Sequence, residues 1–239
     1  MNRLAHLFRK VANFEPLPPA EQAAFEDSVS GVRRFHAHQD LIQEGSAPDG
    51  IKIIVEGMAC RYKMLPDGRR QIVGYFLPGD ICDLRAYLLN RMDHSVATFT
   101  RVEAAIMAPE AMQALTAKFP RITRALWWCT LVDEAIAREW IVNIGYRTAF
   151  ERMAHLFCEM FMRCRAVGLT RDNGIQLPLT QIELADSLAL SPVHVNRTLM
   201  ELRRARLLSF QAGLLTIHDL DELRSLAGFD PNYLHLGAV

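Results

Sequence analysis

The stretch that decides the fold is residues 179–202, which read LTQIELADSLALSPVHVNRTLMEL. Thr180 is a favourable N-cap, and Glu183 three residues later completes a capping box, so a helix is expected to begin here. A second helix is expected after a short turn, because Ser191 can cap it and Pro192 needs no amide donor at a first helical position. Two short helices in this arrangement predict a helix-turn-helix.

The apolar side chains of this stretch predict how the two helices pack. The inner face of the first helix is expected to consist of Ile182, Leu184, Ala185 and Leu188. The inner face of the second is expected to consist of Val195, Leu199 and Leu202. The residues then left to face outward are Val193, His194, Asn196 and Arg197. The alternative is a purely structural corner of two helices, because any packed helix pair shares such apolar positions.

The outward residues can provide the chemistry of DNA recognition, since a helix-turn-helix places the start of its second helix in the major groove. Arg197 can donate two hydrogen bonds to guanine, a pair worth roughly 1–3 kcal/mol of discrimination. Asn196 and His194 can contact bases or phosphates. Val193 offers only apolar contact, for instance with a thymine methyl group.

Phosphate contacts are expected from hydroxyl groups and from arginines. Thr180 and Ser191 lie at predicted helix N-termini, where hydroxyl and amide groups suit phosphate. Residues 197–206 contain four arginines and one acid, and among them Arg203 and Arg204 extend the basic surface. The whole chain has 27 Lys and Arg against 27 Asp and Glu. This balance argues against a nonspecific binder held by a basic surface, but it is compatible with a specific one.

The segment after the two helices predicts a winged helix. Two β-rich runs within residues 207–217 flank Ala212 and Gly213, as expected of a hairpin wing. Asp219 can then cap a last helix that continues to Leu226.

Residues 31–108 have a different character, typical of short antiparallel strands. Glycines recur there at intervals of 12, 11 and 11 residues, at Gly45, Gly57, Gly68 and Gly79. The runs between them are apolar and β-rich, and Pro66-Asp67-Gly68 is a strong turn signal. Short strands at this spacing predict an antiparallel sandwich or barrel.

A long helical pattern joins these two regions, and its main helix is expected to begin at Pro120. One stripe of this helix contains Ile122, Leu126, Cys129, Ile136 and Trp140. A stripe of this length often packs against a copy of itself. The alternative is a helix packed on its own β domain. Because the helix joins two domains, we expect this stripe to form a dimer interface.

Several other classes of protein are not supported by the sequence. It contains no Ser-His-Asp, paired-carboxylate, P-loop or H-E-x-x-H pattern, so we do not expect an enzyme. Its cysteines are odd in number and form no C-x-x-C pair, which argues against a disulfide framework or a zinc site. It has no apolar run of roughly 20 residues that could span a bilayer, and no secretory signal. A cytoplasmic protein without membrane contact is therefore expected.

In these features the chain resembles the Crp/Fnr family of bacterial transcription regulators from about residue 30 to residue 220. The matching positions are Gly45, Gly57, Asp67-Gly68, Gly79-Asp80, the helix 120–144 and the winged helix 147–220. The resemblance implies an α+β fold: a jelly-roll-like antiparallel β-roll of the cyclic-nucleotide-binding type, a long dimerisation helix and a C-terminal winged helix-turn-helix. The implied divisions are residues 1–119, 120–146 and 147–239.

The resemblance also implies roles for particular residues. Ser191 and Arg197 match the family's helix cap and its base-reading arginine. Val193 stands where many members have glutamate, so a different DNA half-site is expected. The implied effector pocket consists of Gly79, Asp80, Asp83, His94, Ser95 and Arg138.

This implied pocket departs from that of a usual cyclic AMP binder. Asp83 stands for the family's glutamate, and His94 stands for its phosphate-binding arginine. A neutral histidine replaces a permanently charged fork poorly, so we expect no cyclic AMP binding of the usual kind. The cofactor and effector stay unassigned. No iron–sulfur cluster is expected, whereas haem ligation stays open at His36, His38, Cys82 and His94.

The function expected from all of this is that of a homodimeric, sequence-specific regulator that reads double-stranded DNA. A two-fold dimer predicts a palindromic operator with half-sites about one helical turn apart, roughly 34 Å. Further expected partners are an unidentified small-molecule effector and, if the protein is an activator, RNA polymerase. The alternative is a ligand-binding regulatory module whose winged helix contacts a partner protein.

Overall fold

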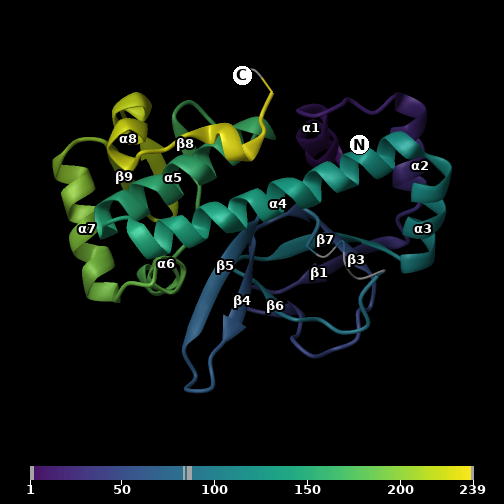
Figure 1. Ribbon diagram of the computed structural model, residues 1–239, viewed down its shortest axis with the longest axis horizontal. Coiled ribbons are helices and arrows are strands. Elements are labelled where there is room, and N and C mark those ends of the chain that lie inside the picture. The colour runs from purple at the N-terminus through teal and green to yellow at the C-terminus, as the bar shows by residue number, and fades with distance from the viewer. Residues whose placement is uncertain (1–2, 83, 85–87, 238–239) are drawn as a thin grey trace.

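The computed structural model describes residues 3–82, 84 and 88–237 (Figure 1). Within these residues the N-terminal half contains two antiparallel sheets, one three-stranded and one four-stranded. The first has the order β1 (Gly31–Phe35), β7 (Val102–Met107), β3 (Ile51–Glu56). The second has the order β2 (Asp40–Ile42), β6 (Ser95–Thr98), β4 (Ala59–Met64), β5 (Arg70–Phe76). Apolar residues from both sheets, such as Phe35, Ile54, Phe76 and Val96, share one core. The predicted antiparallel sandwich is confirmed.

Two of the evenly spaced glycines have a clear conformational reason. Gly57 joins β3 to β4 with φ +89°, and a Cβ there would lie 2.3 Å from the Arg101 carbonyl oxygen. Gly68, in the turn between β4 and β5, has φ +83° but open space around the Cβ position. Gly57 therefore allows a close backbone approach as well as a left-handed conformation, whereas Gly68 supplies only the conformation.

Three helices flank the roll and the start of the long helix (Figure 1). They are α1 (Ala5–Ala12), α2 (Pro19–Asp27) and α3 (Pro109–Lys118). Buried residues of α1, among them Leu7 and Val11, join a core with Ile53 of β3 and Ile122 of the long helix.

The long helix α4 (Pro120–Tyr146) begins at the predicted proline and runs from the roll to the C-terminal half (Figure 1). The stripe assigned to a dimer interface is buried within the same chain. Its members are Ile122 (0 % exposed), Leu126 (3 %), Cys129 (5 %), Ile136 (8 %) and Trp140 (6 %). The prediction that these residues form the dimer interface was therefore wrong, because their side chains already pack on the chain's own domains.

A second apolar stripe lies on the outer face of α4. Trp127 is 67 % exposed, Leu131 52 % and Ile141 73 %. The two stripes are offset around the helix, so one covers the protein's own core while the other is left open. The pattern of the helix indicated an apolar stripe, but it could not decide which stripe the rest of the chain would cover.

The C-terminal half is a winged helix. Its helices are α5 (Ala149–Ala166), α6 (Gln181–Leu188), α7 (Pro192–Arg204) and α8 (Leu220–Ala227). Its three-stranded sheet has the order β8 (Gly174–Gln176), β10 (Leu214–Ile217), β9 (Leu208–Gln211). The wing turns at Ala212 (φ 49°) and Gly213 (φ 75°), the two positive φ values that a tight hairpin favours. The predicted wing is confirmed. No helix in the described ranges has the length and apolar character needed to cross a membrane.

The chain after α8 folds back over α4 and α5 through the short helix η2 (Pro231–Leu234). Its Tyr233 hydroxyl donates to the Glu159 carboxylate over 2.9 Å, and Trp140 Nε1 of α4 donates to the same carboxylate over 3.1 Å. Glu159 is fully buried, and burial raises the pKa of its carboxyl group despite the neighbouring Arg163. This polar centre connects the tail, α4 and α5.

A buried charge cluster continues from there to the β-roll. Arg163 of α5 pairs with Asp80 over 2.9 Å, and Lys10 of α1 pairs with the same carboxylate over 2.6 Å. The Leu77 amide also donates to it over 2.8 Å. Asp80 thus joins α1, the roll and the winged helix.

Candidate nucleic-acid interface

Both predicted helix starts are present at the helix-turn-helix. The Thr180 hydroxyl accepts from the Glu183 amide over 3.2 Å, and the Glu183 carboxylate accepts from the Thr180 amide over 2.7 Å. The Ser191 hydroxyl accepts from the His194 amide over 3.2 Å, with Pro192 at the first helical position. The caps therefore fix where α6 and α7 begin, and with them the outward direction of each residue on α7.

The packing of α6 differs from the prediction at one position. Ile182 is 61 % exposed, while the polar residues Glu183 and Ser187 are buried. The reason is that α6 is covered on two sides, by α7 and by β5 of the roll. The other predicted inner residues of the two helices are buried: Leu184, Ala185, Leu188, Val195, Leu199 and Leu202.

Polar contacts connect α6 to β5. The Arg70 Nε donates to Asp186 over 2.8 Å, and both side chains are largely buried, at 29 % and 22 % exposed. The Tyr75 hydroxyl is hydrogen-bonded to the Ser187 hydroxyl. The placement of the helix-turn-helix therefore depends on the β-roll of the same chain, a contact that no local sequence pattern indicated.

The outer face of α7 presents the predicted reading residues. Val193 is 81 % exposed, Asn196 and Arg197 are exposed, and His194 is half-buried. Met200 is 42 % exposed one turn further along and was not predicted. Its position four residues after Asn196 was the available signal, since such residues share a helix face. An apolar residue, an amide and a guanidinium side by side can read base edges, and their contact with DNA stays a prediction.

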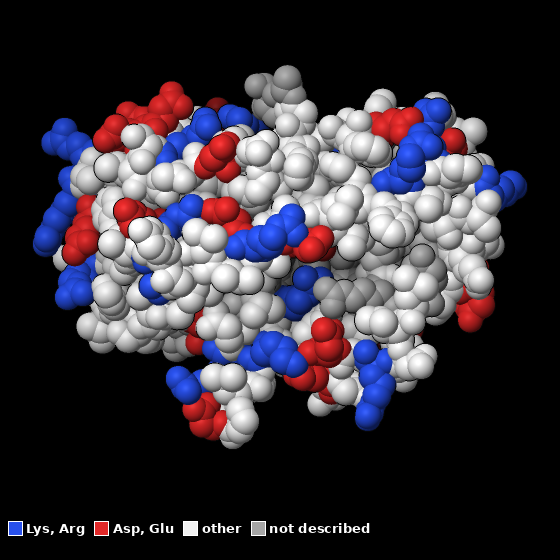
Figure 2. All heavy atoms as spheres, in the orientation of Figure 1, with Lys and Arg blue, Asp and Glu red and all other residues white. Residues whose placement is uncertain are grey.

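The residues expected to contact phosphate divide into two groups. Thr180, Ser191 and Arg204 are exposed around the reading face. Arg203 instead donates to the carbonyl oxygen of Phe210 in β9, so its guanidinium group holds the wing against α7. On the face drawn in Figure 2, basic side chains gather along the edge occupied by α7 in Figure 1, with acidic ones beside them.

Gly79 and Asp80 are engaged in contacts between α1, the roll and α5. A Cβ on Gly79 would lie 2.7 Å from the backbone of His6, so this glycine allows α1 to pack closely. Asp80 is 6 % exposed and is engaged by Lys10 and Arg163. Burial alone would raise the pKa of Asp80, but these two cations outweigh it and hold the pKa below its usual value. The structure gives this pair a packing and ion-pairing role, and its assignment to an effector pocket stays a prediction.

The remaining effector residues are also scattered. The Ser95 hydroxyl accepts from the Glu44 amide over 2.9 Å, and Arg138 is 62 % exposed on α4, paired with Glu134. Asp83 lies outside the described residues. His94 is 4 % exposed and accepts from Arg61 Nε over 3.3 Å. Arg138 in particular pairs with a residue of its own helix, and no hydrogen bond or ion pair joins it to the roll within the described residues.

Arg61 of β4 is a functional candidate that the sequence pattern did not indicate. Besides His94, it contacts the Cys82 carbonyl oxygen and lies over the Phe76 ring at 4.8 Å. A cation is thus present inside the roll, but it comes from β4. The sequence pattern gave no signal for it, because the position lies outside the segment where the family has its phosphate-binding residues.

The four candidate haem ligands differ in their exposure to solvent. His36 and His38 are exposed, whereas Cys82 and His94 are buried. In the described part of the chain, no group of three or more His, Cys, Asp or Glu residues could hold a metal ion. Haem needs only one or two protein ligands, so its ligation at these positions stays a prediction.

These features together define a class: a regulator in which a β-roll and a long helix carry a winged helix-turn-helix. The comparisons with known proteins agree with it. A model described as "Cyclic nucleotide-binding domain" matches residues 32–119, and one described as "Crp-like helix-turn-helix domain" matches residues 151–226.

Two relatives and one solved structure are similar to most of the chain. The transcriptional activator protein FnrL of Cereibacter sphaeroides is 28 % identical over 215 residues, covering 88 % of this chain and 86 % of FnrL. The nitrogen fixation regulation protein FixK of Bradyrhizobium diazoefficiens is 28 % identical over 211 residues, covering 88 % of this chain and 87 % of FixK. The structure of FixK2 from Bradyrhizobium japonicum is similar with a TM-score of 0.75 at 23 % identity, covering 82 % and 96 % of the two chains. The chain belongs to the Crp/Fnr family of DNA-binding transcription regulators.

Proposed function

We propose that the protein acts as a homodimer that reads a palindromic operator with α7 of each subunit. The observation that carries this proposal is the exposed stripe on α4. Its members follow one another at steps of four, three, four and three residues: Trp127, Leu131, Glu134, Arg138 and Ile141. This is the heptad spacing of helices that pair along a seam. A large apolar surface left open on a long helix favours a second copy as its partner.

The centre of this stripe is polar. Glu134 and Arg138 pair within the helix over 2.9 Å, and both are more than 60 % exposed, at 63 % and 62 %. In a parallel pair of helices related by a two-fold axis, each seam residue lies opposite its own copy, so the Glu134–Arg138 pair within each helix offsets the facing like charges. Such a polar layer can set register between the two helices at some cost in stability.

Each subunit then reads one half-site. Arg197 donates to guanine, Asn196 contacts the neighbouring base pair and Val193 packs against a thymine methyl group. Thr180, Ser191 and Arg204 contact phosphate and fix the register on DNA. Because FnrL is named a transcriptional activator, RNA polymerase is the further partner that activation by this chain would require.

A selection from random DNA by the purified protein, without added ligand and at a stated salt concentration, tests operator reading. A palindromic motif with half-sites one helical turn apart is the expected result. The double variant Asn196→Ala, Arg197→Ala should lose the motif while its fold is unchanged. If the double variant enriches the same motif, α7 is not the reading helix. If neither protein enriches any DNA, the alternative of a protein partner for the winged helix replaces the proposal.

The dimer is tested with Leu131→Glu, which places a charge in the exposed stripe. This variant should be monomeric in light scattering and should bind operator far more weakly. Leu65→Glu is the matched control, because Leu65 is also exposed (42 %) but lies in the β4–β5 hairpin, away from α4. A Leu131→Glu protein that keeps the mass of a dimer would remove this stripe from the interface.

A further inference from the structure

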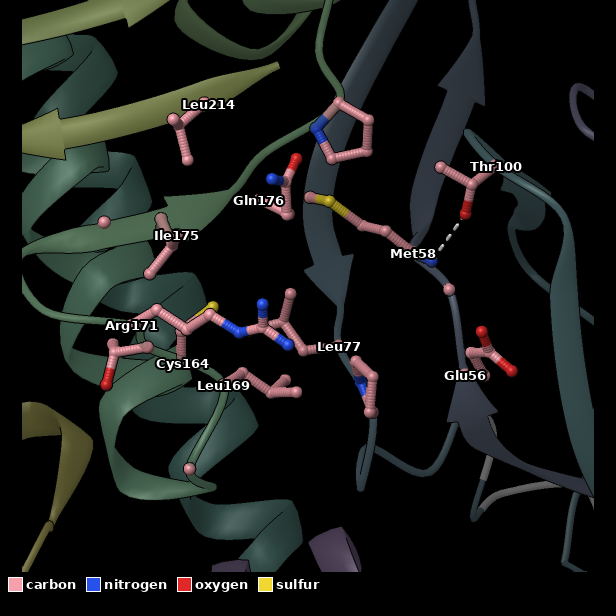
Figure 3. A pocket seen from close by; sticks show the side chains of 16 residues that line it. Glu56, Met58, Leu77, Thr100, Cys164, Leu169, Arg171, Ile175, Gln176 and Leu214 are labelled. Carbon is pink, nitrogen blue, oxygen red and sulfur yellow. Dashed lines mark hydrogen bonds between the residues drawn. The ribbon is translucent and has the colours of Figure 1, made fainter.

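A hollow lies between the two halves of the chain, away from α7 and from the interior of the roll. It measures about 670 Å³, within the range of small-molecule pockets, which often occur where domains meet. One wall comes from the β3–β4 turn and the end of β5. The other comes from the end of α5, the loop that follows it and β8 (Figure 3).

Most of the surface of this hollow is apolar. The residues that provide it are Met58, Leu77, Leu169, Ile175 and Leu214. Cys164 also lines it, and burial raises the pKa of this thiol to about 12, so the sulfur stays protonated and uncharged. A ligand of this site therefore needs an apolar body.

The charge in the hollow points to an anionic group. In Figure 3 the side chain of Arg171 extends from the winged-helix wall toward the wall formed by the roll. Within the described residues, no carboxylate pairs with its guanidinium group. The Gln176 amide lies on the same wall and can add a hydrogen bond. A guanidinium group binds a carboxylate through two parallel hydrogen bonds.

The opposite rim limits the charge that a ligand can carry. Glu56 is the acidic residue among the described lining residues, and its carboxylate is turned away from Arg171 (Figure 3). With one cation near the centre and one anion at the rim, the hollow favours a monoanion over a doubly charged phosphate ester.

We propose that this hollow is a binding site for a small organic monocarboxylate, with the carboxylate on Arg171 and the apolar body between Met58, Leu77 and Leu169. Because the two walls belong to different domains, a bound ligand favours the arrangement in which both walls are present. The site is separate from the position where the family's cyclic nucleotide would bind, and it does not rest on the operator reading proposed above.

Octanoate is the probe, and the methyl resonances of the methionines in the full-length protein are the readout. Octanoate should shift the methyl signal of Met58 and leave that of Met153, which is buried in α5 away from the hollow, unchanged. Octanol and octylamine, which share its chain but lack its charge, should bind at least about ten-fold more weakly.

The variant Arg171→Gln should weaken octanoate binding by about ten-fold or more, because a charge-assisted pair is lost. The matched control is Arg101→Gln, an exposed arginine beside the hollow that does not line it. Leu169→Trp narrows the hollow beside the apolar body of the ligand and should weaken binding independently of charge.

Three results would overturn the proposal: no shift at Met58, equal shifts from octanol and octanoate, or unchanged octanoate affinity in both Arg171→Gln and Leu169→Trp. Since the titration contains no DNA, each of these results leaves the operator selection untouched. Conversely, a failed selection leaves the octanoate result valid.

Discussion

Replacing Asp80 gives a sharp test, because its sequence position suggests an effector-pocket residue whereas the structure places it in a buried ion-pair cluster. If it were an effector-pocket residue, its replacement would alter ligand binding and little else. In the structure its carboxylate is 9 % exposed and holds Lys10 at 2.6 Å and Arg163 at 2.9 Å. The variant Asp80→Asn keeps the shape but removes the charge between two buried cations.

The expected loss follows from this burial. Removing one partner of a buried ion pair costs about 3–5 kcal/mol, whereas an exposed pair is worth about 0–1 kcal/mol. For a chain of this size each kcal/mol lowers the melting temperature by about 2–4 °C, so Asp80→Asn should melt roughly 6–20 °C below the wild type. Arg163 keeps Glu159 as a partner over 3.2 Å, so Lys10 is the cation left without a carboxylate.

The measurements are thermal unfolding and urea unfolding, each followed by circular dichroism. Asp172→Asn is the matched control, because Asp172 lies exposed in a loop and its replacement should change stability by less than about 0.5 kcal/mol. The pKa of Asp80 is lowered in the folded protein, so its contribution is present above the unfolded value and is lost as pH falls through the folded value. The difference between wild type and variant should thus hold from neutral pH down to about pH 4.

A loss of less than about 1 kcal/mol, equal to that of the control, would refute the role assigned to the buried cluster. So would a wild type that cyclic AMP stabilises and an Asp80→Asn variant that it does not. The first outcome would show that the pair is effectively solvated, and the second that Asp80 belongs to a ligand site after all.

Two further predictions concern acid stability and backbone strain. His155 is buried beside Tyr233, and burial, with the charge of Arg147, lowers its pKa to about 3, even though Glu139 lies 3.2 Å away. The unfolded state therefore binds a proton below about pH 6.5 that the folded state does not bind. Between pH 7 and pH 5 the wild type should thus lose about 2 kcal/mol more stability than His155→Phe. Exposed His218→Phe is the control, and equal acid profiles for His155→Phe and wild type would contradict the assignment. Gly57→Ala should cost about 2–4 kcal/mol in urea unfolding, because the positive φ and the clash with Arg101 add. Gly68→Ala shares the positive φ without the clash and should cost about 1 kcal/mol; equal losses would show that the backbone yields at Gly57.

Local patterns in the sequence determined much of this protein. The caps at Thr180 and Ser191 and the proline at position 192 depend on neighbouring residues alone, so the starts of α6 and α7 could be read directly. The same holds for the start of α4 at Pro120 and the turn of the wing. The outward direction of Val193, Asn196 and Arg197 followed from these starts and from helical periodicity.

The tertiary structure decided which surfaces were covered. Helical spacing placed one apolar stripe on α4 at Ile122 and Trp140 and another at Trp127 and Ile141, but burial depends on what packs against each. Asp80 looked like a pocket residue until α1 and α5, distant in sequence, brought Lys10 and Arg163 to it. Arg171 acquires its hollow only because the winged helix lies beside the roll. Capping and periodicity act over a few residues, whereas ion pairs, buried faces and cavities form between segments that the sequence keeps far apart.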